Sequence, residues 1–375
     1  MISLNEKLYS LQRSPIRRFT NLANQTPGCI KLTIGEPDFD TPQAIKEAAI
    51  SALQKGQTHY APNQGLPALR QTIAAFETAR GMACTADQVL ITAGATGALF
   101  TALMGILNPG DEVILPTPAF NLYETIITVA GATPVRLDTA SNNFQITPNA
   151  LAGCITPKTK AILLNSPNNP TGVVLNEVSM DTVKDAILGR DIYLICDNVY
   201  DKLTSGERPD LSLDAALRSQ VLLCQSFSKP YAMTGWRVGY LIGPEDVMER
   251  LLLLNAAQIA AVPTFLQTAC ITALETETES MAAVYQRRRE YACQRLSRMG
   301  LTFPQPRGAF YIFPRIAEFG LSSEEFCTRM IKEAGVAAVP GSCFGVEGYI
   351  RLSFACSDED LEEGLNRLSA FIAKF

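Results

Sequence analysis

The stretch SFSKPYAMTGWRVGY, residues 226–240, determines how the whole chain is interpreted. Its lysine, Lys229, comes shortly after VLLC at residues 221–224, a continuously apolar run that is typical of a strand buried on both faces. A lysine in that position is either a surface side chain whose stem lies along the protein or an amine with a chemical role. The polar residues that follow the other apolar runs decide between the two.

Seven short β-rich runs alternate with helical patterns between about residues 89 and 243. This alternation predicts βαβ units and an α/β fold, with a mostly parallel seven-stranded sheet between helices. The link before the last run is too short for a crossover helix, so we expect that strand to be antiparallel. The runs lie at residues 89–95, 112–120, 133–138, 160–170, 192–200, 221–229 and 236–243.

The chain has 375 residues, which is too long for one ordinary core. We expect a large domain at residues 41–274. Residues 1–40 and 275–375 are expected to form a smaller α+β domain, because the pattern after residue 275 mixes helices with the runs GAFYIFPRI and YIRLSFA.

Composition excludes several classes of function. The net charge of −5 gives no reason to expect nucleic acid or an anionic membrane as a partner. Ten cysteines without a C-x-x-C pair, and a single histidine, His59, predict no metal site and no Ser-His-Asp triad. Free cysteines in apolar runs suit the cytoplasm, and no signal peptide or membrane span is expected. The basic run QRRRE, residues 286–290, is interpreted as a solvated helix face.

Polar residues follow the apolar runs where ligands bind in open α/β sheets, at the carboxyl ends of the strands. Asn169, Asp197 and Lys229 each come after the apolar part of a different run, and the turn AGATG, residues 93–97, opens a helix whose N-terminus can hold an anion. Singly, these residues could form a turn, a helix cap or a surface lysine. Together they provide what pyridoxal phosphate needs: a lysine for a Schiff base, an acid for the ring nitrogen and a phosphate site.

The sequence resembles the class I/II pyridoxal-phosphate aminotransferases of fold-type I, the aspartate aminotransferase superfamily. The resemblance covers nearly the whole chain, and SFSK…GWRVGY preceded by NNPTG and DNVY is highly specific. The matching motifs are LTIGEPDFDTP, HYAPNQGLPALR, TAGATGAL, LNPGDEVILPTPAF, NSPNNPTG, DNVY, SFSKPYAMTGWRVGY, PRGAFYIF, VPGSCFG and YIRLSFA.

The resemblance implies a role for individual residues. Lys229 would form the Schiff base and shuttle the substrate α-proton, and Asp197 would keep the pyridine nitrogen protonated. Asn169 and Tyr200 would bind the cofactor's O3′ atom, and Phe120 would stack on the ring. The residues at family phosphate positions are Ala95, Thr96, Ser226, Ser228 and Arg237.

The resemblance also implies a substrate site and a partner. Arg351 would grip the substrate α-carboxylate in a bidentate fork, beside Gly35 and Asn169. Tyr60 would reach the phosphate of the neighbouring subunit, which implies a homodimer with shared sites. The expected reaction moves an amino group from an L-amino acid to a 2-oxo acid in two half-reactions with ping-pong kinetics.

Some features leave the reaction and its substrate open. Thr96 stands where some aspartate-specific relatives have a lysine, and Arg17 or Arg18 could meet an acidic substrate or be solvated. A β-lyase acting on cystathionine or cysteine is an alternative on the same fold. A non-catalytic amino-acid-binding regulator is a further alternative, but LTIGEPDF starts by about residue 32, leaving no room for a DNA-binding domain.

Overall fold

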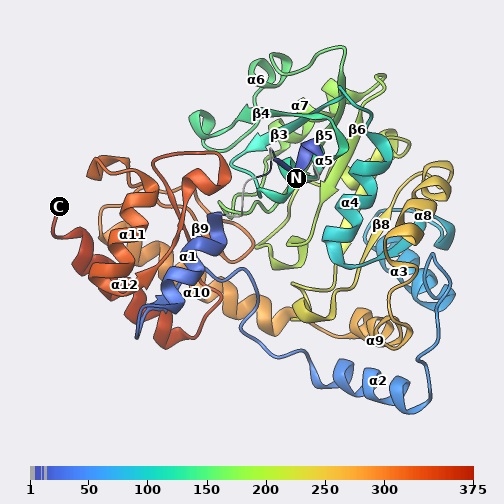
Figure 1. Ribbon diagram of the computed structural model, residues 1–375, viewed down its shortest axis with the longest axis horizontal. Helices are drawn as coiled ribbons and strands as arrows, with labels where there is room; N and C mark the ends of the chain where they lie inside the picture. Colours follow the sequence, from blue (N-terminus) through green and yellow to red (C-terminus); the bar gives the residue numbers. More distant parts are fainter. Residues whose placement is uncertain (1–4, 10, 12–14) are drawn as a thin grey trace.

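A seven-stranded sheet forms the centre of the larger part of the molecule (Figure 1). The computed structural model describes residues 5–9, 11 and 15–375. The strand order is β2-β8-β7-β6-β5-β3-β4, and β8 alone runs antiparallel to the other six strands. The predicted sheet and its antiparallel last strand are confirmed. The strands are β2 Val89–Thr92, β3 Glu112–Thr117, β4 Thr133–Asp138, β5 Thr159–Asn165, β6 Tyr193–Asp197, β7 Val221–Ser226 and β8 Gly239–Ile242.

Helices cover both faces of this sheet because successive strand residues belong to two different apolar cores. On β6, Ile195 packs into the core formed with α4, α5 and α8, whereas Leu194 and Cys196 pack into the core formed with α2, α3, α7 and α9. This two-sided burial explains why the strands are continuously apolar in sequence. The helices are α2 Gln43–Gln54, α3 Pro67–Ala79, α4 Gly94–Ile106, α5 Leu122–Ala130, α6 Pro148–Ala152, α7 Glu177–Ile187, α8 Glu245–Ile259 and α9 Thr264–Glu275.

The smaller part combines the N-terminal segment with about the last quarter of the chain. Strand β1 pairs with β10, and Phe19 and Leu32 share one core with Phe326 and Leu365. Figure 1 shows α1, in blue, beside the orange and red C-terminal elements. This shared core supports the division at residues 40/41 and 274/275, which we keep as a proposal. The elements are α1 Pro15–Asn24, β1 Ile30–Lys31, α10 Glu279–Arg298, β9 Tyr311–Ile312, α11 Ser323–Ala334, β10 Val336–Ala337, β11 Val339–Pro340, β12 Ile350–Ser353 and α12 Asp358–Ile372.

The expectation that residues 286–290 form a solvated helix face is wrong for two of the three arginines. Arg288 and Arg289 are only 8% and 7% exposed. Arg288 forms ion pairs with Asp38, at 2.8 Å, and with Asp358, at 2.7 Å. It thereby ties the N-terminal segment to α10 and α12, since the three residues come from three distant parts of the sequence.

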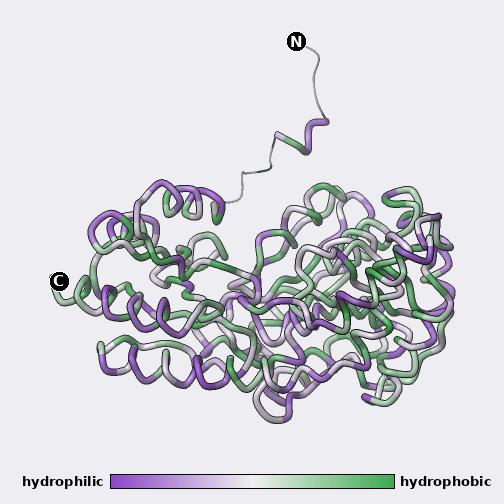
Figure 2. Tube along the Cα trace, turned by 90° about the horizontal axis from the view of Figure 1, so that it is seen from below, coloured by the Kyte–Doolittle hydropathy of each residue, from purple (hydrophilic) through white to green (hydrophobic). Residues whose placement is uncertain are grey.

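Hydrophilic and hydrophobic residues alternate along the outer helices, as Figure 2 shows. This alternation is expected of helices that place one face on a core and the other in solvent. Within residues 5–9, 11 and 15–375, no helix is long and apolar enough to cross a membrane.

Candidate active site

One cavity of about 470 Å³ collects the predicted site residues at the carboxyl ends of β5, β6 and β7. It lies where the sheet meets α1, β9 and β12 of the smaller part. Tyr60 is the one predicted residue outside it, and its side chain is 92% exposed. The predicted residues that line the cavity are Gly35, Ala95, Thr96, Phe120, Asn169, Asp197, Tyr200, Ser226, Ser228, Lys229, Arg237 and Arg351.

Asp197 is the last residue of β6 and is buried on the cavity floor. Its carboxylate accepts a hydrogen bond of 2.6 Å from the Tyr123 hydroxyl. Burial raises the pKa of this carboxyl to about 6, although the Tyr123 hydrogen bond and, more weakly, the charge of Lys229 oppose the rise. A buried carboxylate of this kind favours a cationic partner, such as a protonated ring nitrogen.

Lys229 lies three residues beyond the end of β7, as the sequence predicts. Its ammonium group donates a hydrogen bond to the carbonyl oxygen of Gly35. Burial lowers the pKa of the amine to about 8; the charges of Arg237 and Arg351 act in the same direction and Glu36 opposes it. An amine with a lowered pKa is partly neutral at physiological pH and can attack a carbonyl group.

The N-terminus of α4 lies at one end of the cavity, where Ala95 and Thr96 line it. The helix begins at Gly94 without a side-chain cap, so its first N–H groups have no acceptor within the helix. A helix N-terminus of this kind can bind an anion. Arg237 adopts a left-handed backbone conformation with a φ of 55°. A Cβ atom at Gly94 would lie 2.7 Å from the Arg237 guanidinium, so glycine is what allows the arginine to approach the helix terminus.

The opposite end of the cavity presents Arg351 from β12. Its guanidinium donates to the side-chain oxygen of Asn169, at 2.8 Å, and to the backbone oxygen of Thr33, at 2.9 Å. The Nε atom of Arg351 and the hydroxyl of Thr33 are both buried without a hydrogen-bond partner. Buried polar groups normally have partners, so these two atoms indicate where a carboxylate would bind.

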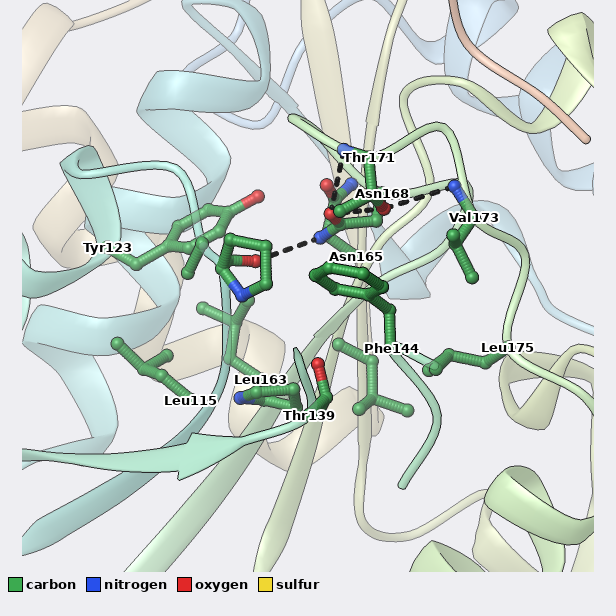
Figure 3. A pocket seen from close by; sticks show the side chains of 14 residues that line it. Leu115, Tyr123, Thr139, Phe144, Leu163, Asn165, Asn168, Thr171, Val173 and Leu175 are labelled. Carbon is green, nitrogen blue, oxygen red and sulfur yellow. Dashed lines mark hydrogen bonds between the residues drawn. The ribbon is translucent and has the colours of Figure 1, made fainter. Parts of the chain in front are cut away.

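Side chains of the loop that carries Asn169 form hydrogen bonds within that loop (Figure 3). The Asn168 side-chain oxygen accepts hydrogen bonds from the backbone and the hydroxyl of Thr171, at 3.2 and 2.9 Å. Asn165 joins this loop to β6, since its side chain accepts from the Asn169 N–H and donates to the Asp197 carbonyl oxygen. A cavity of only about 30 Å³ lies behind this loop, and Asn165 and Tyr123 line both cavities.

Two tyrosines at the site were missed in the sequence analysis. Tyr123 binds Asp197, and Tyr311 lies beside Tyr200 with 3.1 Å between their hydroxyl oxygens. Tyr123 lies three residues after Phe120, at the spacing that places both on one side of a helix start. That spacing is a signal that could have indicated Tyr123, whereas Tyr311 lies in an aromatic run that reads as core.

The N-terminal helix presents neutral side chains to the cavity. Ile16 and Thr20 line it, four residues apart on one face of α1. Arg17 and Arg18 are exposed on other faces, and Arg18 forms an ion pair of 2.9 Å with Glu324. Of the two expectations for these arginines, the structure supports solvated residues.

The donor set fits pyridoxal phosphate. A buried carboxyl, a partly neutral amine and a helix N-terminus beside Arg237 surround one cavity whose size is ordinary for a small-molecule site. Lys229 and Asp197 would hold the reactive end and the ring, and Ser226, Ser228 and Arg237 the phosphate.

Comparisons with known proteins agree with this geometry. A probable N-acetyl-LL-diaminopimelate aminotransferase of Bacillus subtilis is 40% identical over 378 residues, covering 99% of this chain and 96% of that protein. Aromatic-amino-acid aminotransferase 2 of Thermococcus litoralis is 40% identical over 379 residues, covering 98% and 97%. The crystal structure of an aspartate aminotransferase from Thermotoga maritima matches with a TM-score of 0.95 at 36% identity, covering 99% of this chain and 100% of that one.

The family described as aminotransferase class I and II matches residues 27–368, and its members generally depend on pyridoxal phosphate. The predicted family, fold and reaction class are confirmed. The chain therefore belongs to the class I and II aminotransferases, and it is an enzyme that transfers amino groups.

Proposed function

We propose that the chain binds pyridoxal 5′-phosphate through Lys229 and moves an amino group from an L-amino acid to a 2-oxo acid. The observation that carries this proposal is the pairing of a buried amine with a lowered pKa and a buried carboxyl, Asp197, in one cavity. Pyridoxal phosphate supplies an electron sink for the electron pair that remains when the Cα–H bond of the amino acid breaks.

The residues of the chain have separate tasks in this reaction. Arg351, with Asn169 and Gly35, binds and orients the substrate α-carboxylate. Lys229 takes the proton from the substrate Cα atom as a neutral amine, which its lowered pKa permits. With the cofactor bound, Asp197 would hold the proton of the ring nitrogen, and Tyr200 would donate a hydrogen bond to the ring oxygen.

A donor screen tests the proposal. The purified holoenzyme is mixed with single amino acids, and the absorbance of the Lys229-bound cofactor is followed together with the 2-oxo acid formed. The relatives are named for three kinds of substrate, so the panel includes aspartate, phenylalanine and N-acetyl-LL-diaminopimelate. We expect at least one donor to yield the amino form of the cofactor and its oxo acid.

Lys229→Ala is the control for the screen, and it should abolish the conversion. A panel in which no donor is converted, or a Lys229→Ala protein as active as wild type, would refute the proposal. Release of pyruvate and ammonia from cystathionine without an acceptor would instead support the β-lyase.

We also propose that the protein works as a homodimer. Tyr60 is 92% exposed and lies outside the cavity of its own chain. At the end of the cavity next to the α4 N-terminus, Thr96 and Arg237 are also exposed. A second subunit that supplies Tyr60 would complete this end. A cytoplasmic location is proposed as well, because all ten cysteines are free.

Subunit exchange tests the shared site. Lys229→Ala and Tyr60→Ala proteins are mixed under conditions that allow subunits to exchange. A hybrid dimer contains one site with both residues intact, so the mixture should be more active than the mean of its two components. Additive activity, or a monomer in sedimentation analysis, would contradict the shared site.

A further inference from the structure

Tyr311 contacts both Tyr200, a predicted cofactor-binding residue, and Arg351, the predicted substrate-binding arginine. It is the first residue of β9 and is only 1% exposed. Its hydroxyl oxygen is 3.1 Å from that of Tyr200, and the Arg351 guanidinium lies 4.4 Å from the centre of its ring. The ring of Phe310 packs edge-on against the ring of Tyr311, with 4.7 Å between the ring centres.

The geometry of the two tyrosines limits what their hydroxyls can do. Burial raises the pKa of both hydroxyls, so both keep their protons at neutral pH. A phenol has a single proton, and at 3.1 Å either hydroxyl can be the donor to the other. A Tyr200 that donates its proton to the cofactor must therefore accept from Tyr311.

The ring of Tyr311 also supports the guanidinium of Arg351. Arg351 is 3% exposed, and its guanidinium donates to the neutral oxygens of Asn169 and Thr33 rather than to a carboxylate. A buried cation in this situation depends on other compensation. The face of Tyr311 provides it at 4.4 Å, with Phe344 at 5.1 Å.

We propose that Tyr311 is a positioning residue for both Tyr200 and Arg351. Its hydroxyl donates to Tyr200 and so directs the Tyr200 proton toward the cofactor, while its ring holds Arg351 in place for the substrate carboxylate. This inference rests on the proposed function. It also explains Gly35, because a Cβ atom there would approach the Tyr311 hydroxyl to 3.1 Å.

Two substitutions separate the hydroxyl from the ring. Tyr311→Phe removes only the hydroxyl, and Tyr311→Leu removes the ring as well. The first measurement is a pH titration of the absorbance of the Lys229-bound cofactor. Loss of one hydrogen bond to Tyr200 weakens donation to the ring oxygen, so the bound cofactor should hold its proton more tightly. We expect its apparent pKa to rise by about half a unit to one unit in both variants.

The second measurement is the binding of substrate analogues that cannot lose an α-proton. The probes are α-methyl-aspartate, α-methyl-phenylalanine and α-methyl-leucine, used with each holoenzyme. Tyr311→Phe should bind the best probe within about twofold of wild type, because the ring remains under Arg351. Tyr311→Leu should bind it about 5- to 30-fold more weakly. Tyr349→Leu removes a ring that is stacked on Phe313 outside the cavity and should change neither measurement.

The results distinguish this inference from the proposed function. A wild-type protein that takes up no cofactor refutes both. If the wild type binds the cofactor and converts a donor, but the bound cofactor has the same apparent pKa in Tyr311→Phe, the role of the hydroxyl is overturned. Unchanged probe binding by Tyr311→Leu overturns the role of the ring. If Tyr311→Leu does not fold, Tyr311→Phe still decides: binding weakened more than tenfold would show that the ring alone does not hold Arg351.

Discussion

The amine of Lys229 should titrate near pH 8 in the cofactor-free protein, well below an ordinary lysine. Burial is the largest cause of the lowered pKa, and Arg237 and Arg351 add to it. The pKa falls from the ordinary 10.5 to about 8. Because each pKa unit changes the ratio of neutral to charged amine tenfold, the neutral fraction of Lys229 at pH 7 is about 300-fold larger than that of an ordinary lysine.

Amine labelling measures this difference directly. The cofactor-free protein is exposed briefly to a small amine-selective reagent between about pH 6 and pH 10, and the labelled peptides are quantified by mass spectrometry. The labelling rate of Lys229 should reach half its maximum near pH 8. Exposed lysines in the same digest, such as Lys158, give the reference profile. A Lys229 profile that coincides with the reference would refute the lowered pKa of this amine.

Substitution of a neighbouring charge should move the midpoint in a direction fixed by its sign. Glu36 raises the pKa of Lys229, so Glu36→Gln should move the labelling midpoint below that of wild type. Arg237 lowers the pKa, so Arg237→Gln should move the midpoint upward. Shifts in the same direction for both variants would show that burial changes, rather than charge, determine the result.

Two further perturbations test the surroundings of the site. Burial raises the pKa of Asp197 from 3.8 to about 6, so this carboxyl favours the folded state below pH 3.8 and loses that contribution as the pH rises through 6. Asp197→Asn should therefore stabilise the cofactor-free protein by about 3 kcal/mol at neutral pH. This expectation would be contradicted if the denaturation midpoint of the variant, relative to wild type, did not rise between acidic and neutral pH. At Gly239, a Cβ atom would lie 2.6 Å from the Gln225 oxygen and the Gly94 carbon, so Gly239→Ala should destabilise the protein by about 3 kcal/mol and weaken cofactor binding. Gly235→Ala, where a Cβ atom meets nothing within 4 Å, is the matched control for the same denaturation and binding measurements.

The sheet and most of the cavity could be predicted from the sequence because their signals are local. Strands buried on both faces must be apolar throughout, so each run was visible without knowledge of its neighbours. The residues after the runs then meet at one edge, because parallel strands place their carboxyl ends together. Asn169, Asp197 and Lys229 were located by this argument alone, and the family resemblance added the roles of Arg351 and Gly35.

The residues that were missed or misjudged depend on contacts between distant segments. Arg288 follows the buried Tyr285 by three residues, at a helical spacing that indicates an inward face. Its charge suggested solvent, since Asp38 and Asp358, which pair with it, are more than 60 residues away in the sequence on either side. The two-residue strands β1 and β10 carry no pattern of their own and form only because the N-terminal segment lies along the C-terminal part.

The same distinction explains why the sequence shows which groups meet but not how the pKa of each group is shifted. Burial shifts the pKa of Asp197 and of Lys229 toward the neutral form of each, to about 6 and about 8. Burial is a property of the assembled cavity, so no spacing in the chain reveals it. The consequence is chemical: the site holds a carboxyl that gains from a cationic ring nitrogen and an amine that is neutral often enough to accept a proton. A surface lysine and aspartate at the same sequence positions would be fully charged, strongly hydrated and unsuited to either task.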